Sequence, residues 1–391
     1  MLLKLPQNVC FILDSLETNG FEAFAVGGCV RDMLMGENPH DFDVTTNALP
    51  DDVKAIFPHT ADTGIKHGTV TVIHGGTPVE VTTYRTEGAY TDSRRPDSVQ
   101  FVSDINLDLA RRDFTVNAIC YSPKRGLVDP YGGQQDINDG ILRAVGDPET
   151  RFGEDALRIL RLFRFSSKLC FLPEKSTLSE ALKLSDTLSL VSVERISSEL
   201  SKAATGRNPA ALIPLIESGA LRFIGLDNPK DISHIKNLPK REDIRLFSLL
   251  FLGGKDACET AKKLKCKNSF IGYCADMQAL LSCPPPEDDI QIKSALKKYD
   301  SGLIFDLADF SAAIYGKDLT PLKDQTERIL KSGEAYRVDM LSVGGKDLMK
   351  IGISGRDIGK TLDLLLDRVI AKPNLNTSTK LLSLACEIHR N

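Results

Sequence analysis

The feature that most restricts the fold of this chain is a change in its hydrophobic pattern near residue 145. Before this point, short β-like runs alternate with helical segments, and the runs HGTVTVI (67–73) and TPVEVTTYR (77–85) flank a predicted hairpin turn. After it, apolar residues recur at spacings of three and four, as in DALRILRLFRF (155–165). We therefore expect an α+β domain, with a small mixed sheet and helices on one face, followed by an all-α remainder.

Length and composition indicate a globular protein of several domains. The chain has 391 residues, more than one hydrophobic core usually organises, and 42% of them are hydrophobic. Its net charge is −4, so nucleic-acid binding would have to depend on local basic patches. The first helical segment lacks the features of a signal peptide, and no apolar segment is long enough to cross a bilayer. We therefore expect a cytoplasmic protein without a membrane partner.

Nine cysteines occur without a CxxC pair, which favours reduced thiols. Cys258, Cys266 and Cys274 recur every eight residues, close to a whole number of helical turns. This spacing could bring them together in a metal site. Zinc ligands are usually spaced more closely, however, so the pattern favours packing in a core.

The sequence HDFDV (40–44) places two carboxylates two residues apart. In a strand, Asp41 and Asp43 would project from the same face and repel each other, and a divalent cation such as Mg²⁺ would relieve this repulsion. Glu80 lies in another predicted strand and could complete a cluster of three acids, which can hold two metal ions. The alternatives are a solvated turn for the two aspartates and a solvent-facing strand position for Glu80.

Three further segments carry residues suited to a nucleotide. Gly27 and Gly28 follow a predicted strand and open a helix, where backbone N–H groups can approach a phosphate, and Arg31 could add positive charge. RRDFTVNAI (111–119) predicts an amphipathic helix that is either a capped helix with an ion pair or part of the site. In the second case Arg112 would neutralise phosphate, and two polar side chains would bond a ribose hydroxyl. Those two are Asp113 and Asn117.

The segment 151–165, RFGEDALRILRLFRF, predicts one amphipathic helix with a charged stripe. Glu154 and Asp155 are spaced to pair with Arg158, and Arg161 continues the stripe. The stripe could be a salt-bridged surface face. Alternatively, Asp155 and Arg158 could offer an acceptor and donors to the edge of cytosine or adenine, since both bases place an amino donor beside a ring-nitrogen acceptor.

The ordered motifs GGCVRD, HDFDVTT, EVTTYR, YTDSRRPDSV, RRDFTVNAI, DPYGGQQDINDG and EDALRILRLFRF cover most of residues 25–165. In this order they resemble the class II tRNA nucleotidyltransferases and bacterial poly(A) polymerases of the polymerase β superfamily. VSVERISSEL (191–200) resembles the neck of these enzymes, and residues 344–370 resemble their tail more faintly. The resemblance implies a head (1–145), a base-recognising neck (146–218), a body (219–335) and a tRNA-binding tail (336–391).

The resemblance also implies an activity, namely template-independent addition of C, C and A to the 3′ end of tRNA from CTP and ATP. It implies two Mg²⁺ ions and no required protein partner. Carried over by position, it implies metal binding by Asp41 and Asp43 and a third catalytic carboxylate at Glu80. The implied nucleotide-binding residues are Gly27, Gly28, Arg31, Arg112, Asp113, Asn117, Asp155, Arg158 and Arg161.

Several alternatives stay open at this point. Family members that add only CC, only A, or poly(A) share these motifs, although TEGAYTDSRRPDSV (86–99) resembles the full flexible loop of the CCA-adding members. An inactive RNA-binding relative would have no use for three clustered acids, which destabilise one another. A small-molecule nucleotidyltransferase would not need the long helical remainder. Lys346, Lys350, Arg356 and Lys360 are candidate tRNA contacts in the tail.

Overall fold

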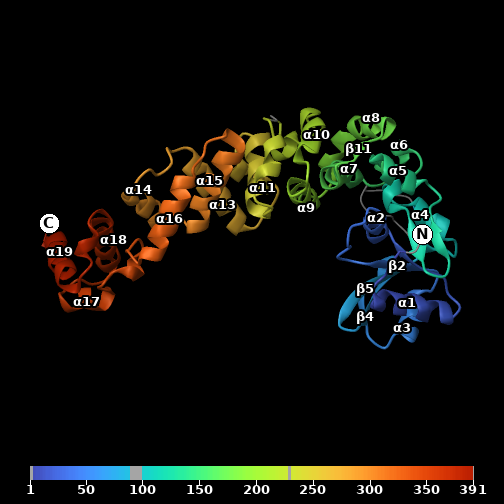
Figure 1. Cartoon of the computed structure of the whole chain (residues 1–391), viewed down its shortest axis with the longest axis horizontal. Coiled ribbons are helices and arrows are strands. Elements are labelled where there is room, and N and C mark those ends of the chain that lie inside the picture. Colours follow the sequence, from blue (N-terminus) through green and yellow to red (C-terminus); the bar gives the residue numbers. More distant parts are fainter. Residues whose placement is uncertain (1–2, 89–98, 228–229, 391) are drawn as a thin grey trace. The chain divides into compact units, whose positions relative to one another are not determined.

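A computed structural model describes residues 3–88, 99–227 and 230–390 of the protein (Figure 1). The chain forms two compact units. The N-terminal unit comprises Met1–Ser233 with Lys263–Lys265, and the C-terminal unit comprises His234–Lys262 with Cys266–Asn391. The finer division at residues 145, 218 and 335 stays a prediction.

A mixed sheet forms the first part of the N-terminal unit, as the sequence predicted. Its strands lie in the order β3-β4-β5-β2-β1-β8-β9, and β2 and β5 are parallel neighbours while the other neighbours are antiparallel. The predicted hairpin is β4 with β5. The bounds are Ala23–Val26 (β1), Asp43–Thr46 (β2), Thr60–Gly64 (β3), Thr69–His74 (β4), Thr77–Thr83 (β5), Cys120–Ser122 (β8) and Gly126–Val128 (β9). Two small sheets pair Arg85–Glu87 (β6) with Val99–Phe101 (β7), and Ile141–Leu142 (β10) with Leu172–Pro173 (β11).

Helices cover this sheet and continue beyond it. In Figure 1 α1 and α3 lie beside β4 and β5, while α5 to α8 lie at the other end of the unit. Helix α7 packs against α9. The helices are Gln7–Thr18 (α1), Gly28–Leu34 (α2), Pro50–Ile56 (α3), Ile105–Ala110 (α4), Gly133–Asp139 (α5), Pro148–Glu154 (α6), Leu157–Leu169 (α7), Lys175–Lys183 (α8), Val193–Ala204 (α9) and Ile213–Glu217 (α10).

Two helix predictions in this unit were wrong. The segment 111–119 forms only a short 3-10 turn, Thr115–Asn117, because the chain around Phe114 is extended and pairs with Ala144. The segment 151–165 is two helices, with Asp155 in extended conformation between them (φ −139°, ψ 104°). The Asp155 carboxylate accepts the N–H of Leu157 at 3.1 Å, and such a side-chain bond starts a new helix at the expense of continuing the old one.

The regular elements in the described residues of the C-terminal unit are helices, joined by short connections. One of its cores gathers Leu348, Leu365, Leu366, Val369 and Leu381 from α17, α18 and α19. The helices are Glu242–Gly253 (α11), Ala257–Lys263 (α12), Asn268–Leu281 (α13), Asp289–Lys298 (α14), Ser301–Tyr315 (α15), Thr320–Ser332 (α16), Gly345–Lys350 (α17), Arg356–Ala371 (α18) and Ser378–Arg390 (α19). Among the described residues, no helix combines the length and apolar character needed to span a membrane.

The three regularly spaced cysteines meet in this unit. Cys274 is buried, and Cys258 and Cys266 are half-buried. Burial, together with the two neighbouring thiols, raises the pKa of Cys274. In the described parts of the chain no three His, Cys, Asp or Glu side chains form a group suited to a metal ion. Core packing of these cysteines stays a prediction.

Candidate active site

The sheet brings two of the predicted acids together. Strands β2 and β5 run parallel with Asp43 directly opposite Glu80, so the two side chains project beside each other on one face. On β5, Val79 and Val81 are buried, which turns Glu80 to the opposite, exposed face. The expectation that Asp41 lies in the same strand was wrong, since β2 begins at Asp43 and Asp41 precedes it.

The three carboxylates repel one another but do not form a closed cage. Loss of hydration, followed by the charge of Glu80, raises the pKa of Asp43, and Asp41 adds to this while Arg112 opposes it. Within the described residues, no three His, Cys, Asp or Glu side chains are placed so that they could hold a metal ion together. Oxygen ligands and surplus negative charge nevertheless suit a divalent cation at Asp43, because such an ion would offset the repulsion.

The glycine turn before α2 requires glycine. Gly27 has φ 78° and ψ −127°, a conformation that other residues rarely adopt. A Cβ at this position would lie 2.8 Å from Nη1 of Arg112. The turn therefore brings backbone and the Arg112 guanidinium close together, as a phosphate site would need.

Arg31 is held more tightly than its predicted role suggests. Its Nε and Nη2 donate to Asp32 at 2.8 and 2.6 Å, and its Nη1 donates to the side-chain oxygen of Asn117 at 2.5 Å. The side chain is buried. These bonds fix the Arg31 guanidinium beside Gly28, where its charge acts on the cavity described next.

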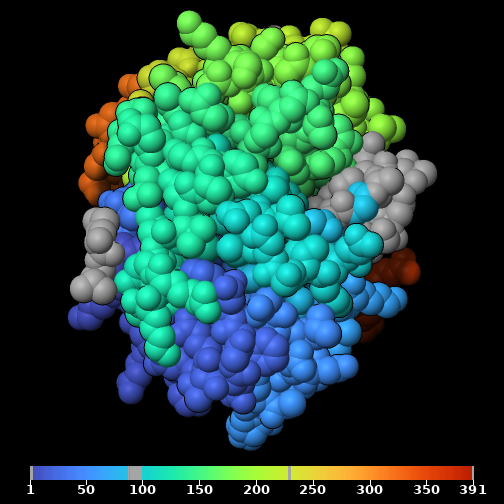
Figure 2. Space-filling model, turned by 90° about the vertical axis from the view of Figure 1, so that its right-hand side faces the viewer, coloured from blue at the N-terminus to red at the C-terminus, as the bar shows by residue number. Residues whose placement is uncertain are grey.

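A cavity of about 450 Å³ in the N-terminal unit gathers nine of the twelve predicted site residues. Gly27, Asp41 and Glu80 are the three that do not line it. The nine are Gly28, Arg31, Asp43, Arg112, Asp113, Asn117, Asp155, Arg158 and Arg161. In Figure 2 the cyan and teal residues that follow β7 lie between the blue residues of the first strands and the green helical residues, and the cavity takes its lining from all three segments.

The cavity also has lining residues that the sequence analysis missed. Arg164, Phe165 and Lys168 continue the stripe of Arg158 and Arg161 along α7, so the helical spacing was the available signal. Arg111 adjoins Arg112 in the sequence. Nothing local identified Arg195, which reaches the cavity from α9 only through the packing of α9 on α7.

The charge of the cavity wall favours an anion. Eight arginine or lysine residues line it against three aspartates. Several of the carboxylates that pair with these cations do not line the cavity themselves. Examples are Asp108, Glu154 and Glu199. A ligand that carries several negative charges, such as a nucleoside triphosphate, therefore matches this wall.

Asp113, which lines the cavity, accepts hydrogen bonds from three other residues. Its Oδ2 accepts from Nε and Nη2 of Arg161 at 2.9 and 2.5 Å, and its Oδ1 accepts from Asn117 at 3.0 Å and from the N–H of Phe114 at 2.8 Å. Burial alone would raise the pKa of Asp113. The charge of Arg161 and the bond from Asn117 outweigh it and hold that pKa well below its usual range.

Replacing Asp113 with Asn should lower the free energy of unfolding by about 2 kcal/mol at pH 7, because the Arg161 guanidinium loses its buried partner. A depressed pKa contributes stability above the unfolded-state value and loses it as the pH falls, so the difference between the two proteins should shrink below about pH 4. Urea unfolding at pH 7 and pH 3 measures this. Asp139→Asn, at an exposed position, is the control, and an equal difference at both pH values would contradict the pairing.

Asp155 and Arg158, which also line the cavity, are held in position by other residues. Oδ2 of Asp155 accepts from Nη2 of Arg195 at 2.8 Å. Arg158 pairs with Glu154, as predicted, and its Nη2 donates to the carbonyl oxygen of Arg111 at 2.9 Å. A carboxylate acceptor and guanidinium donors thus line one wall in orientations that other residues hold.

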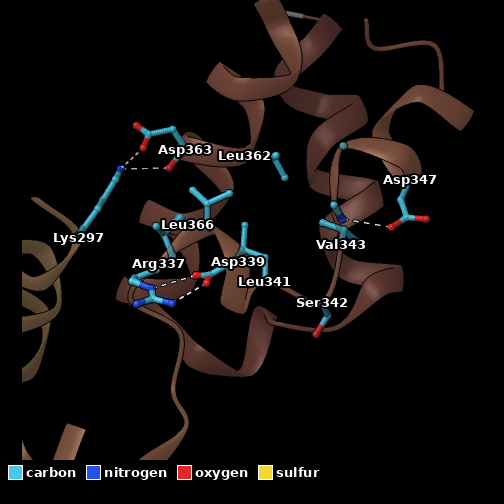
Figure 3. Close-up of a pocket in the computed structure, with 13 residues that line it drawn as sticks. Lys297, Arg337, Asp339, Leu341, Ser342, Val343, Asp347, Leu362, Asp363 and Leu366 are labelled. Atoms are coloured by element: carbon cyan, nitrogen blue, oxygen red, sulfur yellow. Dashed lines mark hydrogen bonds and ion pairs between the residues drawn. The ribbon is translucent and has the colours of Figure 1, made fainter. Parts of the chain in front are cut away.

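A larger cavity, of about 930 Å³, lies in the C-terminal unit (Figure 3). Its charged side chains pair with one another or with nearby groups: Lys297 with Asp363 at 2.8 Å, and Arg337 with Asp339 at 2.6 Å. Asp347 accepts the N–H of Gly344. Among the tail candidates, Lys350 and Lys360 pair with aspartates of their own helices. This cavity has no surplus positive charge, and none of the predicted site residues line it.

The chain is similar to known proteins along nearly its whole length. Residues 23–143 match the Poly A polymerase head domain. The chain is 46% identical over 380 residues to a CCA-adding enzyme of Geobacillus thermodenitrificans, with 94% of each chain covered. It is 45% identical over 219 residues to the CCA-adding enzyme of Limosilactobacillus reuteri strain DSM 20016, an alignment that covers 56% of this chain and 54% of that protein.

A solved structure gives the same result. The Bacillus stearothermophilus CCA-adding enzyme in complex with CTP superposes with a TM-score of 0.86 at 32% identity, covering 98% of this chain and 97% of that one. The sequence similarity and the similarity of fold both point to the same family. The chain belongs to the CCA-adding enzymes, a family of tRNA nucleotidyltransferases.

Proposed function

We propose that this protein adds C, C and A to the 3′ end of tRNA, using CTP and ATP and releasing pyrophosphate. The observation that carries the proposal is one cavity that Asp43, Asp155 and Arg158 line together with further cationic side chains. This arrangement suits a nucleotide with its phosphates near the acids and its base near Asp155. The 3′ hydroxyl of the tRNA would attack the α-phosphorus, and the bond from that phosphorus to pyrophosphate would break.

Asp41 and Asp43 would hold two Mg²⁺ ions, with Glu80 as the third catalytic carboxylate. When bound, the ions activate the attacking hydroxyl and stabilise the leaving pyrophosphate. The position of Asp43 directly opposite Glu80 on parallel strands supports the proposal, since a divalent cation would offset the repulsion between the two carboxylates.

The rest of the cavity would bind the nucleotide. Gly27, Gly28 and Arg31 would hold phosphates, and Arg112 would add a cation beside them. Asn117 would reach the ribose while Asp113 keeps Asn117 and Arg161 in place. This last role follows from the bonds of Asp113, whose two oxygens both accept from protein groups.

Asp155 and Arg158 would select the base. Cytosine and adenine share a donor beside an acceptor, which a carboxylate and a guanidinium can satisfy together, whereas guanine and uracil present the reverse. The neighbouring groups Arg195 and Glu154 would hold the pair in position. We also propose that the protein acts in the cytoplasm without a required protein partner, in line with its nine free cysteines.

The test uses purified protein, Mg²⁺, CTP, ATP and three tRNA transcripts, which end before the CCA tail, after its first C and after its second C. Sequencing of the product ends should show CCA on all three. Arrest at CC, extension of only the last transcript, or long runs of A would each replace the proposal with a partial-adding enzyme or a poly(A) polymerase. The choice of full CCA addition rests on the motif at residues 86–99, most of which (89–98) lies outside the described residues.

A further inference from the structure

The segment that carries Asp41 makes few contacts of its own. It joins α2 to β2, and its residues Asn38, Pro39, His40 and Asp41 make no hydrogen bond or ion pair with any described residue. Asn38, His40 and Asp41 are exposed. The position of the Asp41 carboxylate therefore depends on how the two ends of this segment are fixed.

Both ends of the segment are held by the protein. One end is Asp43, which is paired within the sheet. The other end is Glu37. Gly36 closes α2 in the left-handed conformation (φ 76°), and the N–H of Glu37 donates to the carbonyl oxygen of Asp32 at 2.8 Å. The Glu37 carboxylate accepts from Nη2 of Arg207 at 2.5 Å. Glu37 is thus the last residue before Asp41 whose side chain has a partner.

Arg207 is itself anchored on another part of the N-terminal unit. Its N–H donates to the carbonyl oxygen of Ser167 on α7 at 2.9 Å, and the N–H of Asn208 donates to the same oxygen at 2.9 Å. A Cβ at Gly206 would lie 2.2 Å from Oγ of Ser167, so the backbone before Arg207 lies directly on this helix. The ion pair of Glu37 with Arg207 therefore ties the start of the Asp41 segment to the packed helices α7 and α9.

We propose that Arg207, through Glu37, positions the segment that carries Asp41 and so strengthens the binding of divalent cations at Asp41 and Asp43. Asp41 lies four residues after Glu37, which spans at most about 14 Å of extended chain. A displacement of Glu37 therefore reaches Asp41 over a short distance. Arg207 is a positioning residue, because its ion pair is with Glu37 and not with either acid. The inference rests on the proposed function, since it takes Asp41 and Asp43 as metal ligands.

A purely electrostatic influence of Arg207 would have the opposite sign. Removing a cation near an acidic site makes that site bind divalent cations more tightly. The loss of the tie should instead weaken binding, because the Asp41 carboxylate is no longer held ready for the ion. Arg207 and Glu37 are 58% and 37% exposed, and an exposed ion pair of this kind is worth about a two- to fivefold effect.

The variants leave the anchor of Arg207 intact. Arg207→Met removes the guanidinium and keeps the backbone bond to Ser167. Glu37→Arg combined with Arg207→Glu restores an ion pair of reversed direction at the same net charge. Arg125→Met is the matched control, because Arg125 is 45% exposed, pairs with Glu22 at 2.8 Å and lies in the same unit outside the cavity lining.

Two measurements test the positioning role. Titration with Mn²⁺, followed by EPR in the absence of tRNA and nucleotide, gives the Kd of the cation. The Mg²⁺ concentration for half-maximal CMP incorporation gives the dependence in the working protein. Both values should rise about two- to fivefold in Arg207→Met, return towards wild type in the exchanged pair and stay unchanged in Arg125→Met. In about 1 M KCl, which screens exposed ion pairs, Arg207→Met and wild type should differ little.

Tighter or unchanged Mn²⁺ binding in Arg207→Met would overturn the inference. So would a lower unfolding temperature with unchanged metal affinity, which would make the pair a purely structural contact, and so would an exchanged pair that binds Mn²⁺ no better than Arg207→Met. If wild-type protein added no nucleotide to tRNA but the difference in Mn²⁺ binding persisted, the proposed function would fail and the positioning role of Arg207 would stand.

Discussion

Asp43→Asn should lower the rate of nucleotide incorporation by at least about a thousandfold, the equivalent of about 4 kcal/mol of transition-state stabilisation. Asp43 lies at the edge of the cavity, opposite Glu80, and is proposed to hold metal with Asp41. The amide keeps the shape of the side chain and removes the charge that would hold the ion. Single-turnover incorporation of CMP into tRNA measures the rate. Asp62→Asn, at an exposed position of the same sheet, is the control.

The same variant separates catalysis from folding. A carboxyl group whose folded-state pKa is raised contributes stability below its unfolded-state pKa, and this contribution is lost as the pH rises through the folded value. At pH 7 and without metal, Asp43→Asn should therefore unfold at the same temperature as the wild type or higher, and should bind tRNA equally well. Retained incorporation, or a marked loss of thermal stability, would show that Asp43 is a structural residue instead.

Replacing both Asp155 and Arg158 with Ala should lower the discrimination against UTP and GTP by a factor of about ten to a hundred. Each lost buried polar partner of the base is worth about 1 to 3 kcal/mol, which is enough to let UTP and GTP compete. The affinity for the triphosphate should change less, because the cations near Gly28 stay in place. The measurement is kcat/KM for the four nucleoside triphosphates on a tRNA transcript, and unchanged discrimination against UTP and GTP would refute the assigned role.

Arg158 also has a structural part, so the design needs a second variant. Its bonds to Glu154 and to the carbonyl oxygen of Arg111 join α6, α7 and the segment before the 3-10 turn. Asp155→Asn alone leaves the bonds of Arg158 intact. It replaces one carboxylate oxygen, a hydrogen-bond acceptor, with an amide NH2 group, which is a donor. It should shift base preference and lower the unfolding temperature only by what the ion pair of Asp155 with Arg195 contributes. Loss of all activity together with a large loss of stability would indicate that only the fold was affected.

The local part of the site followed from short sequence patterns. Alternating Val and Thr residues predicted the strand that carries Glu80, because the period of two separates a buried face from an exposed one. Helical spacing predicted that Arg158 and Arg161 share a face of α7. The same spacing of three residues would also have predicted Arg164 on this face. The shift to helices after residue 145 likewise predicted the α+β and all-α parts.

Local sequence patterns gave two wrong helix predictions, at places where backbone groups form hydrogen bonds outside the helical pattern. The segment after Arg112 looked helical, yet its backbone pairs with residues 143–145 and continues into a strand of the sheet. The helix expected across Asp155 is broken by a single side-chain bond to Leu157. In both places a hydrogen bond outside the helical pattern is formed, and helix propensity alone does not predict such a bond.

The sequence by itself determined the family of the chain and the change from sheet to helices, since both depend on residue type and short spacing. It also predicted acids, glycines and arginines for the site, of which nine line the cavity. Only the tertiary structure decided that β2 and β5 are parallel neighbours with Asp43 opposite Glu80, and that α9 brings Arg195 to Asp155. It also decided which cations face the cavity and which are held by carboxylates. Contacts between residues far apart in the chain depend on how whole elements pack, and no short pattern encodes that packing.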